Sequence, residues 1–521
     1  MADLDHIIIG SGINGLVAGA MLSRAGKKVL IIERSESFGG CMSTEEVTLP
    51  GFKHDVMAAT FVLFITSPAY AELNSDLKKH GLEFCHSAYP TAVIRPNGTS
   101  LILSTDQSAN FKRISALNND DGKQFLKDIN EIANDADFLF SLLGGSLWSW
   151  QIFKVISKQI WKKGLRNLTN WFGGALISAR TWLENSYTHP LSQALFAPWV
   201  LHTGLTPEST YSGQMGKVIA FALEAAGAPI VKGGSGQAVS AFKSLIEANG
   251  GRFMVSTDVN KIIVKNEKAT GVITTDGKRI DAPSVIASVT PGQLYDRLLS
   301  DNSTELVNEN GGFRHGRGNF QIHYALDAPP EWNDPTLREV ALIHLSDGID
   351  AVSKSSNEAE RGMLPETPTI CVGQPAALDP TRCPNGKSIL WIQIPDAPST
   401  IKGDAAGKIN NGPEWENEVT ELFANRIEDL LKTHIKNFKN IKLQRQCYSP
   451  TQLSKLNINL VGGDPYGGAC SIDQFFLWRP FNNSINNQTI IKNLHHIGAS
   501  THPGPGLSGG SGFNLAKKLG T

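Results

Sequence analysis

Three glycines spaced as G-x-G-x-x-G, at Gly10, Gly12 and Gly15, directly follow the β-branched run Ile7–Ile9. Apolar residues then recur at helical spacing, and a second apolar run spans Val29–Ile32. Strand, tight turn, helix and second strand in this order predict a β-α-β unit of a parallel sheet, with the glycine turn at the helix N-terminus. This pattern is typical of a dinucleotide-binding domain.

The turn has the chemistry that a pyrophosphate requires. Gly10 permits the tight turn, Gly12 lets the backbone approach the phosphates, and Gly15 lets the helix pack closely on the strand. Backbone N–H groups and the partial positive charge of the helix N-terminus, around Ser11 and Asn14, favour a bound anion. We therefore expect these five residues to bind the cofactor.

An acidic residue and a second pair of glycines indicate which dinucleotide binds. Glu33 ends the second strand, where its carboxylate can accept hydrogen bonds from both ribose hydroxyls and disfavours the 2′-phosphate of NADP. Arg34 and the pair Gly39–Gly40 follow as E-R-x-x-x-x-G-G. This extension favours FAD over NAD, because the glycines let the backbone run beside the ribityl chain and the flavin ring. A surface loop with two turn glycines is the alternative.

The composition excludes several classes of protein. With 41% hydrophobic and 19% charged residues and a formal net charge of −1, the 521-residue sequence predicts neither a disordered chain nor a globally basic nucleic-acid binder. Six cysteines without a C-x-x-C pair predict reduced thiols in a cytoplasmic protein, with no disulfide framework and no metal site. No uninterrupted apolar stretch is long enough to predict a membrane span.

The sequence resembles the phytoene desaturase-like flavoproteins, which are the carotenoid desaturases and isomerases and their relatives in the amine-oxidase superfamily. Within this group it is more similar to the branch described as pyridine nucleotide-disulfide oxidoreductase domain-containing than to the carotenoid enzymes. The stretches that resemble the group, besides the first motif, are "GGCMSTEEVTLPGFKHDVMAAT" (39–60), "GAPIVKGGSGQAVSAFKSLIEANGG" (227–251), "VNKIIVKNEKATGVITTDGKRIDAPSVIASVTP" (259–291), "GGDPYGGACSIDQFFLWRP" (462–480) and "GASTHPGPGLSGGSG" (498–512). Cys41 departs from the group, because many of its members have Arg after the glycine pair.

The resemblance implies that residues outside the first motif also contact FAD. They fall in the loop from the flavin to the substrate cavity, at the adenine, and in the stretch 498–512, where backbone would meet the pyrophosphate, the ribityl chain and the N1–C2=O edge of the flavin. These residues are Cys41, Ala59, Thr60, Val259, Gly498, Ala499, Gly506 and Leu507.

The resemblance also implies the fold class and a discontinuous domain layout. The fold is α/β, with a Rossmann-like FAD-binding domain and an α+β substrate-binding domain of the amine-oxidase and phytoene desaturase type. The FAD-binding domain would comprise residues 1–68, 228–295 and 455–521, and the substrate-binding domain residues 69–227 and 296–454. Alternating runs around the hairpin turn Asp276–Gly277 support strands in the second FAD-domain segment.

Three polar residues are candidates for a catalytic role. His202 lies in a segment where members of the branch also have His and would act as a base near the flavin, with a satisfied core histidine as the alternative. His502 would face the pyrimidine end of the flavin. Arg479 flanks "QFFLW" together with Asp473, and a buried ion pair between these two residues is the alternative. No catalytic triad or carboxylate pair stands out, which fits a mostly apolar site.

The expected reaction is the removal of a hydride from a lipophilic, polyene- or isoprenoid-like substrate, which forms a C=C bond while flavin N5 accepts the hydride. A quinone or oxygen would take up the electrons. The alternatives are a redox-neutral flavin isomerase, an amine oxidase that releases hydrogen peroxide, and a lipid binder similar to dissociation inhibitors of small GTPases. The stretch "NFQIHYALDAPPEW" (319–332) has no Lys, although amine oxidases of this superfamily often place one there.

Residues 147–183 form a candidate membrane-docking segment. From Phe138 to Leu183 the sequence has no acidic residue, yet it has six basic residues and five of the ten tryptophans. Basic amphipathic helices with tryptophans can lie in a bilayer interface, which would place the protein peripherally on the inner face of a membrane. A solvated helix whose Trp face packs on the substrate domain is the alternative.

Overall fold

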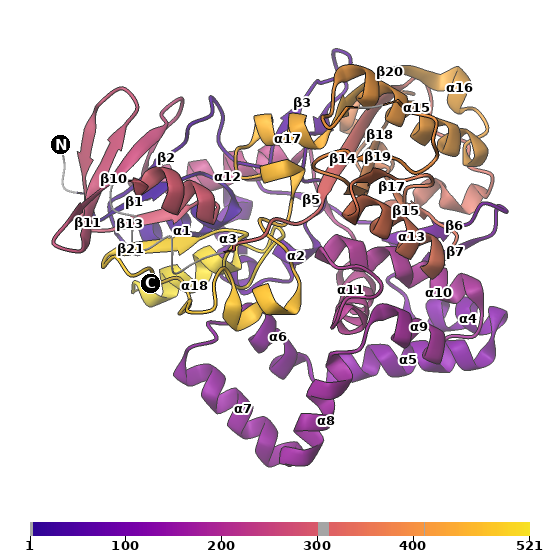
Figure 1. Ribbon diagram of the computed structural model, residues 1–521, viewed down its shortest axis with the longest axis horizontal. Helices are drawn as coiled ribbons and strands as arrows, with labels where there is room; N and C mark the ends of the chain where they lie inside the picture. Colours follow the sequence, from indigo (N-terminus) through magenta and orange to yellow (C-terminus); the bar gives the residue numbers. More distant parts are fainter. Residues whose placement is uncertain (1–3, 301–311, 411, 521) are drawn as a thin grey trace.

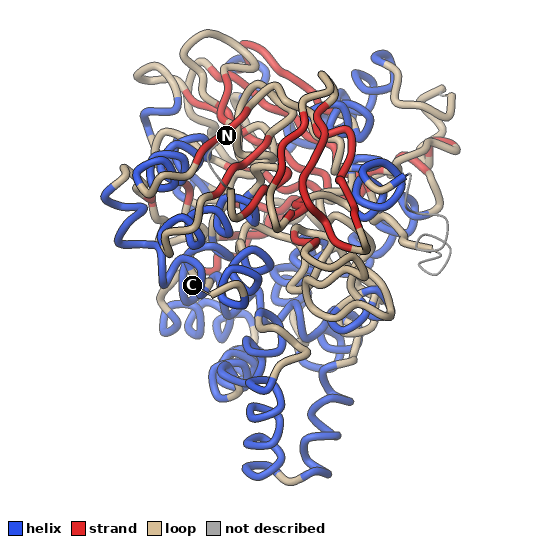
Figure 2. Tube along the Cα trace, turned by 90° about the vertical axis from the view of Figure 1, so that its left-hand side faces the viewer, coloured by secondary structure: helices blue, strands red, loops and turns tan. Residues whose placement is uncertain are grey.

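The computed structural model describes residues 4–300, 312–410 and 412–520. Figure 1 shows two lobes side by side, each built around a sheet, and a helical hairpin that projects below them. Turned by 90°, the hairpin still extends beyond the rest of the chain (Figure 2). The mixed architecture, with a Rossmann-like lobe beside a second α+β lobe, confirms the predicted fold class.

The first lobe contains the predicted β-α-β unit. Its five-stranded parallel sheet has the order β21-β13-β1-β2-β9. The strands are β1 (His6–Ile9), β2 (Val29–Ile32), β9 (Arg252–Met254), β13 (Val285–Ser288) and β21 (Leu494–Ile497). All five fall inside the three segments assigned to the FAD-binding domain from the sequence. In a parallel sheet, the carboxyl ends of these strands meet at one edge, where ligands bind.

Helices and a small antiparallel sheet complete this lobe. Gly512 allows the close approach of the last helix, because a Cβ atom there would lie 2.0 Å from the carbonyl oxygen of Asn14. The helices are α1 (Ile13–Arg24), α3 (Pro68–Lys79), α12 (Ser235–Ala248) and α18 (Gly510–Lys518). The antiparallel strands are β10 (Val259–Lys265), β11 (Lys268–Thr274) and β12 (Arg279–Asp281), with the predicted turn at Gly277.

The second lobe contains a seven-stranded sheet of the order β20-β14-β18-β17-β15-β6-β7. One face packs its aromatic side chains, such as Phe320 and Tyr324, against α15 (Asn417–His434) and α16 (Phe438–Ile441). The opposite face presents the polar side chains of Asn319, Gln321 and His323 on β14, and it also packs apolar side chains such as Val93 and Trp391 in a second hydrophobic cluster. The strands are β6 (Thr91–Ile94), β7 (Ser100–Leu103), β14 (Gly318–Leu326), β15 (Leu342–Leu345), β17 (Ile370–Gly373), β18 (Ser388–Ala397) and β20 (Lys442–Tyr448).

Helices of the segment 107–226 lie below this sheet in Figure 1, and the hairpin extends from them. They are α4 (Gln107–Leu117), α5 (Asn119–Asn134), α6 (Ala136–Gly144), α7 (Trp150–Lys163), α8 (Leu165–Ala175), α9 (Ala179–Ser186), α10 (Pro190–Phe196), the 3₁₀ helix η1 (Ala197–Thr203) and α11 (Ser212–Ala226). Within the described ranges, none of the helices combines the length and the apolar character that crossing a membrane requires.

The remaining elements are mostly short. They are β3 (Thr44–Glu45), β4 (His54–Asp55), α2 (Val62–Ile65), β5 (Phe84–Cys85), β8 (Ile230–Val231), α13 (Ile349–Glu360), β16 (Met363–Leu364), α14 (Pro375–Leu378), β19 (Gly403–Asp404) and α17 (Pro450–Leu456). A buried charge cluster lies where β4 meets the turn 379–382 and the start of α12. The guanidinium of Arg382 bonds the carboxylates of Asp55 at 2.6 Å and Asp379 at 3.0 Å. Asp55 also accepts from the backbone N–H of Ser235 at 2.7 Å, which agrees with a structural role.

Candidate cofactor and substrate site

A cavity of about 450 Å³ opens where the carboxyl ends of the parallel strands face the seven-stranded sheet. It is lined by most of the residues that the sequence predicts to bind the cofactor. Those that line it are Gly10, Ser11, Gly12, Asn14, Glu33, Arg34, Gly39, Gly40, Cys41, Val259, Gly498, Ala499, Gly506 and Leu507. Residues from both halves of the sequence therefore meet in one cavity, as the resemblance implied.

The glycine turn has the shape of a phosphate cradle. Gly10 has φ +91°, and a Cβ atom on Gly15 would lie 2.3 Å from the carbonyl oxygen of Gly10, so both positions require glycine. Gly12 differs, since no atom of the described residues lies within 4 Å of the position that its Cβ would occupy. Gly12 is also the N-cap of α1, and no side chain of the described residues caps the helix. Free backbone N–H groups at the N-terminus of α1 thus border the open space, which fits a pyrophosphate.

Hydrogen bonds connect the glycine turn to Glu33 and to the glycine pair Gly39–Gly40. Glu33 accepts from the backbone N–H of Ser11 at 3.0 Å and from its hydroxyl at 2.7 Å. The Ser11 hydroxyl oxygen in turn accepts from the N–H of Gly39 at 3.0 Å. At Gly40, which has φ +59°, a Cβ atom would lie 3.0 Å from Cα of Gly12. The two glycine loops therefore pack directly on each other beside the cavity.

Cys41 follows the glycine pair and lines the same cavity. Burial raises the pKa of its thiol to about 11, and Asn457 donates to its sulfur at 3.5 Å. The thiol is therefore protonated at neutral pH and lacks the thiolate character of a nucleophilic cysteine. Cys41 therefore places a short, uncharged side chain beside the space that we predict for the flavin ring.

The charged residues that line the cavity gather near the end of β2 and at β10. Arg34 lies 3.9 Å from the carboxylate of Asp258, and Arg297 lies 3.3 Å from it. Arg297 also donates to the carbonyl oxygen of Val259 at 2.8 Å, which fixes the backbone predicted to touch the adenine. Glu33 lies in the same region, and Glu45 is exposed.

Amide side chains line the cavity on the side of the seven-stranded sheet. Asn319 and Gln321 alternate along β14, and Gln393 on β18 lies opposite Gln321 in the strand register. Asn319 and Gln321 are 1% and 4% exposed, yet both polar atoms of Asn319 and Oε1 of Gln321 have no hydrogen-bond partner among the described residues. Buried polar atoms normally have partners, so these atoms indicate that a ligand with hydrogen-bonding groups completes the site.

Three residues predicted to bind the cofactor do not line the cavity. Gly15 lies behind the turn, where its role is close packing. Ala59 packs in a hydrophobic cluster of the second lobe, and Thr60 is the next residue along the chain. Val56, Met57 and Ala58 take the lining positions in this loop. The predicted stretch is thus displaced by a few residues along the chain. The binding roles of all these residues stay predictions.

His502 and Arg479 lie outside the lining of the cavity. His502 Nε2 hydrogen-bonds the carbonyl oxygen of Gly145 at 2.9 Å, and burial lowers the pKa of the ring to about 4. Arg479 is 1% exposed and donates to backbone carbonyls, including Tyr466 at 2.8 Å and Ala499 at 2.8 Å. Arg479 therefore holds the loop that contains Ala499 in place.

The expected ion pair between Asp473 and Arg479 does not form. Asp473 is exposed and pairs with Arg314 at 2.7 Å instead. Arg479 needs no carboxylate because several carbonyl oxygens already accept from its guanidinium. This alternative, which the spacing in the sequence suggested, is wrong.

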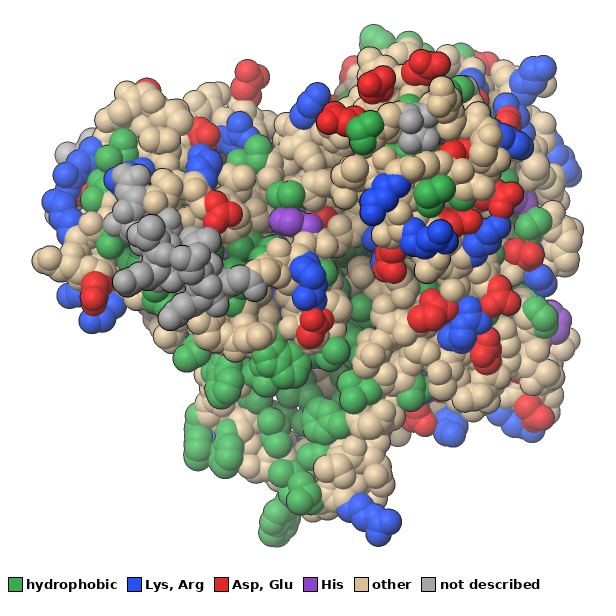
Figure 3. Space-filling model, viewed as in Figure 1, with side chains coloured by type: hydrophobic (Ala, Val, Ile, Leu, Met, Phe, Trp, Pro, Cys, Tyr) green, Lys and Arg blue, Asp and Glu red, His purple; other side chains and the backbone are tan. Residues whose placement is uncertain are grey.

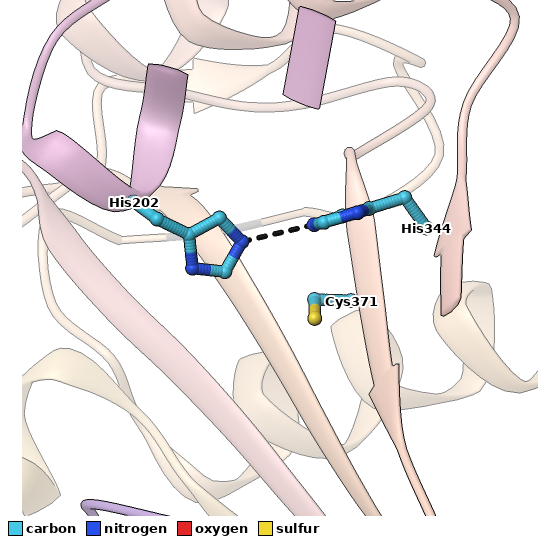
Figure 4. A group of neighbouring side chains, drawn as sticks. All are labelled: His202, His344 and Cys371. Carbon is cyan, nitrogen blue, oxygen red and sulfur yellow. Dashed lines mark hydrogen bonds between the residues drawn. The ribbon is translucent and has the colours of Figure 1, made fainter. Parts of the chain in front are cut away.

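His202 belongs to a cluster on the polar face of the large sheet, shown in Figure 4. Its Nε2 atom lies 2.9 Å from Nε2 of His344, and the ring nitrogens lie within 4.8 Å of Cys371 Sγ. Burial lowers the pKa of His202 to about 4 and holds that of His344 well below its usual value, so both rings are neutral, one donating and one accepting. Cys371 lies opposite Gln393 in the register, so the cluster is one strand away from the cavity.

The sequence analysis missed several lining residues. They lie at and after the end of β13, on the helical turn 292–298, on α17 and in the stretch that follows α17: Ser288, Val289, Thr290, Arg297, Leu453, Leu456, Asn457, Ile458, Asn459, Leu460, Gly463, Pro465 and Gly467. The amides Asn319 and Gln321 had a recognisable signal, because polar residues alternate with Phe320 and Ile322 in an otherwise apolar strand. Gln393 and the loop residues had none.

Comparison with known proteins agrees with this arrangement. Residues 8–77 match the family of NAD(P)-binding Rossmann-like domains. The chain is 26% identical to pyridine nucleotide-disulfide oxidoreductase domain-containing protein 2 of Rattus norvegicus, with 99% of this chain and 93% of that protein covered. It is 25% identical to a limonene dehydrogenase component of Castellaniella defragrans (99% and 94% covered) and 22% identical to the neurosporene-forming phytoene desaturase of Rhodobacter capsulatus (98% and 93% covered).

Solved structures share the fold. A putrescine oxidase variant with redesigned cofactor binding has a TM-score of 0.61 at 15% identity, with 99% of this chain and 98% of that chain covered. An oxidoreductase from Methanosarcina mazei has a TM-score of 0.59 at 17% identity, with 99% and 100% covered. The glycine cradle, the buried amides without partners and the relatives that match nearly the whole chain agree with one another: the chain is an FAD-dependent oxidoreductase that is similar to the phytoene desaturases.

Proposed function

We propose that the protein removes a hydride from a lipophilic, isoprenoid-like substrate and forms a C=C bond. The observation that supports this most directly is the absence of charge on the sheet side of the cavity. There the described lining residues of β14 and β18 are the carboxamides Asn319, Gln321 and Gln393. Relatives named for limonene and for phytoene agree with a lipophilic isoprenoid.

The side chains in the cavity would bind and orient the substrate rather than take part in covalent chemistry. When bound, FAD supplies the hydride acceptor. Asn319 and Gln321, fixed on a strand, would hydrogen-bond a hydroxyl or carbonyl group of the isoprenoid and so hold it in one orientation against the ring. Cys41, half-buried and protonated, adds no charge on the loop side of the cavity. The uncharged wall disfavours an ammonium substrate, which would need a carboxylate to offset its desolvation.

The experiment uses the flavin-loaded protein under anaerobic conditions. Limonene, phytoene and a lipid extract of the source cells are added separately, while the flavin absorbance is recorded and the products are analysed by mass spectrometry. The proposal expects bleaching of the flavin and a product that lacks two hydrogen atoms. A product of unchanged mass without net bleaching would identify an isomerase instead. Hydrogen peroxide formation with putrescine in air would identify an amine oxidase.

Two substitutions connect such activity to the cavity wall. Gln321→Leu nearly keeps the volume but removes the hydrogen-bonding groups, so for a substrate that has a hydroxyl or carbonyl group we expect FAD retention with a KM raised about tenfold. The matched control is Gln159→Leu, since Gln159 is also buried but lies on α7, where it bonds Asp135. Equal kinetics for both variants would contradict a substrate site at β14.

A further inference from the structure

The hairpin of α7 and α8 has the most exposed aromatic side chains of the described residues. Trp161 is 95% exposed, Trp150 68% and Phe153 57%. Single exposed apolar side chains are ordinary on a protein surface, but contiguous ones mark a surface that binds another. Figure 3 shows apolar side chains gathered over the projecting hairpin and the base from which it extends. The exposed members of this apolar surface are Phe140, Trp148, Trp150, Phe153, Trp161, Leu165, Phe172 and Leu176.

Basic side chains alternate with the exposed aromatic residues. Lys154, Lys158 and Lys162 are exposed on α7, and Arg166 is exposed on α8. Neither helix contains an acidic residue, so no internal pair neutralises these charges. The ammonium of Lys154 lies 5.9 Å from the centre of the Trp150 ring, which places a cation directly beside an exposed aromatic face.

Helix α7 of the hairpin is anchored near both of its ends, and α8 is anchored by an aromatic contact. Asp135, at the start of α6, accepts from Gln159 at 3.1 Å and from Lys163 at 2.6 Å. At the other end, Asn486 accepts from the N–H of Trp148 and donates to its carbonyl oxygen. Phe138 packs on Trp171 with ring centres 5.1 Å apart. The apolar surface is therefore held in a fixed orientation, and its exposure does not follow from a loose segment.

In the structure, the exposed apolar surface is shorter than the segment 147–183 that the sequence predicts to dock on a membrane. Arg180 pairs with Glu184, Glu208 and Asp350, and Trp182 is 2% exposed with its indole bonded to Asp128. Both residues belong to the packed substrate lobe. The exposed surface therefore ends near Leu176.

We propose that the α7–α8 hairpin docks the protein on an anionic lipid bilayer, with its tryptophans in the interface and its lysines at the headgroups. The pairing of exposed Trp and Phe with uncompensated Lys fits this partner. An isologous contact between two copies would instead bring the same lysines face to face. Insertion is limited to the interface, since α7 has only 14 residues and several charges. The docking does not depend on which substrate the cavity binds.

The test is flotation of the flavin-loaded protein with vesicles of phosphatidylcholine alone or with about a third phosphatidylglycerol. We expect the protein to float with the anionic vesicles and much less with the neutral ones. Lys154, Lys158 and Lys162 changed together to Glu should lower the partition coefficient about a hundredfold, at roughly fivefold or more for each lysine. The matched control changes Lys265, Lys268 and Lys278 to Glu, which are exposed on the small sheet of β10–β12.

The apolar contribution is tested separately. Trp150, Phe153 and Trp161 changed together to Ser should abolish flotation, whereas Leu422→Ser and Leu443→Ser, exposed on α15 and β20, should not. Retained flavin absorbance shows that each variant is folded. Equal flotation of the hairpin and control variants would overturn the proposal. A second outcome would also overturn it: the wild-type protein does not float, light scattering shows it to be a dimer, and the triple Ser variant of the hairpin is a monomer.

Discussion

The Nε2 atom of His502 lies 2.9 Å from the carbonyl oxygen of Gly145. A carbonyl only accepts, so this nitrogen is protonated and donates. Further along the chain, Asn514 on α18 donates its side-chain amide to the carbonyl of Gly144 at 2.8 Å. The C-terminal stretch whose Gly498 and Ala499 line the cavity is therefore bonded to the turn between α6 and α7, at the base of the hairpin.

We expect His502→Ala to loosen the base of the hairpin rather than stop the chemistry. The variant should be cleaved by trypsin several times faster within the basic segment 154–166, because the bond to Gly145 is lost. Limited proteolysis followed by mass spectrometry measures this. If His502 instead faced the flavin, the variant would lose turnover while the cleavage rate stayed at the wild-type level.

We expect Gly12→Ala to weaken FAD binding without destabilising the fold. No atom of the described part of the chain lies within 4 Å of the added methyl group, so the free energy of unfolding of the apoprotein should change little. The methyl group would however stand in the space predicted for the pyrophosphate, so FAD affinity should fall about tenfold or more.

Flavin fluorescence on titration with FAD, together with a thermal melt, measures both quantities. Gly173→Ala is the control, since that glycine also has open space around it but lies on α8. Unchanged FAD affinity in Gly12→Ala would show that the cradle is not the phosphate site.

Arg382→Ala should destabilise the protein severely. The guanidinium is fully buried between Asp55 and Asp379, and its removal leaves two buried carboxylates without their cation, at a cost of about 3–5 kcal/mol. Chemical denaturation measures the loss. Arg180→Ala, which breaks three exposed ion pairs, serves as comparison, with an expected cost below about 1 kcal/mol.

The Cys41 thiol should resist alkylation at ordinary pH. Because burial raises its pKa to about 11, the thiolate is about one part in a thousand at pH 8, and the fraction grows tenfold for each pH unit up to that value. Iodoacetamide labelling followed by peptide mass spectrometry, compared with free N-acetylcysteine, measures the rate against pH. Rapid labelling of Cys41 at pH 7 would contradict the buried, protonated state.

The sequence predicted those parts of the site whose geometry depends on local chemistry. Gly10, Gly12 and Glu33 could be placed because a strand, turn and helix fix their relation within a few tens of residues. Asn319 and Gln393 could not, because their position at the cavity depends on how the two lobes meet and on the register of β14 with β18. The partner of Arg479 was wrong for a related reason: spacing along the chain favoured Asp473, but the backbone carbonyls of Tyr466 and Ala499 accept from the guanidinium instead.

The strand order of the parallel sheet constrains how this chain can fold. β1 and β2 lie near the start of the sequence, yet their sheet also needs β13 and β21. β21 follows β13 about two hundred residues later in the sequence. Until β21 pairs, β13 presents an unpaired edge of apolar residues, which is a hazard for aggregation during synthesis. Such distant pairings make folding slow. We therefore expect the second lobe to fold first as a separate unit and to bring the missing strand β21 to the sheet.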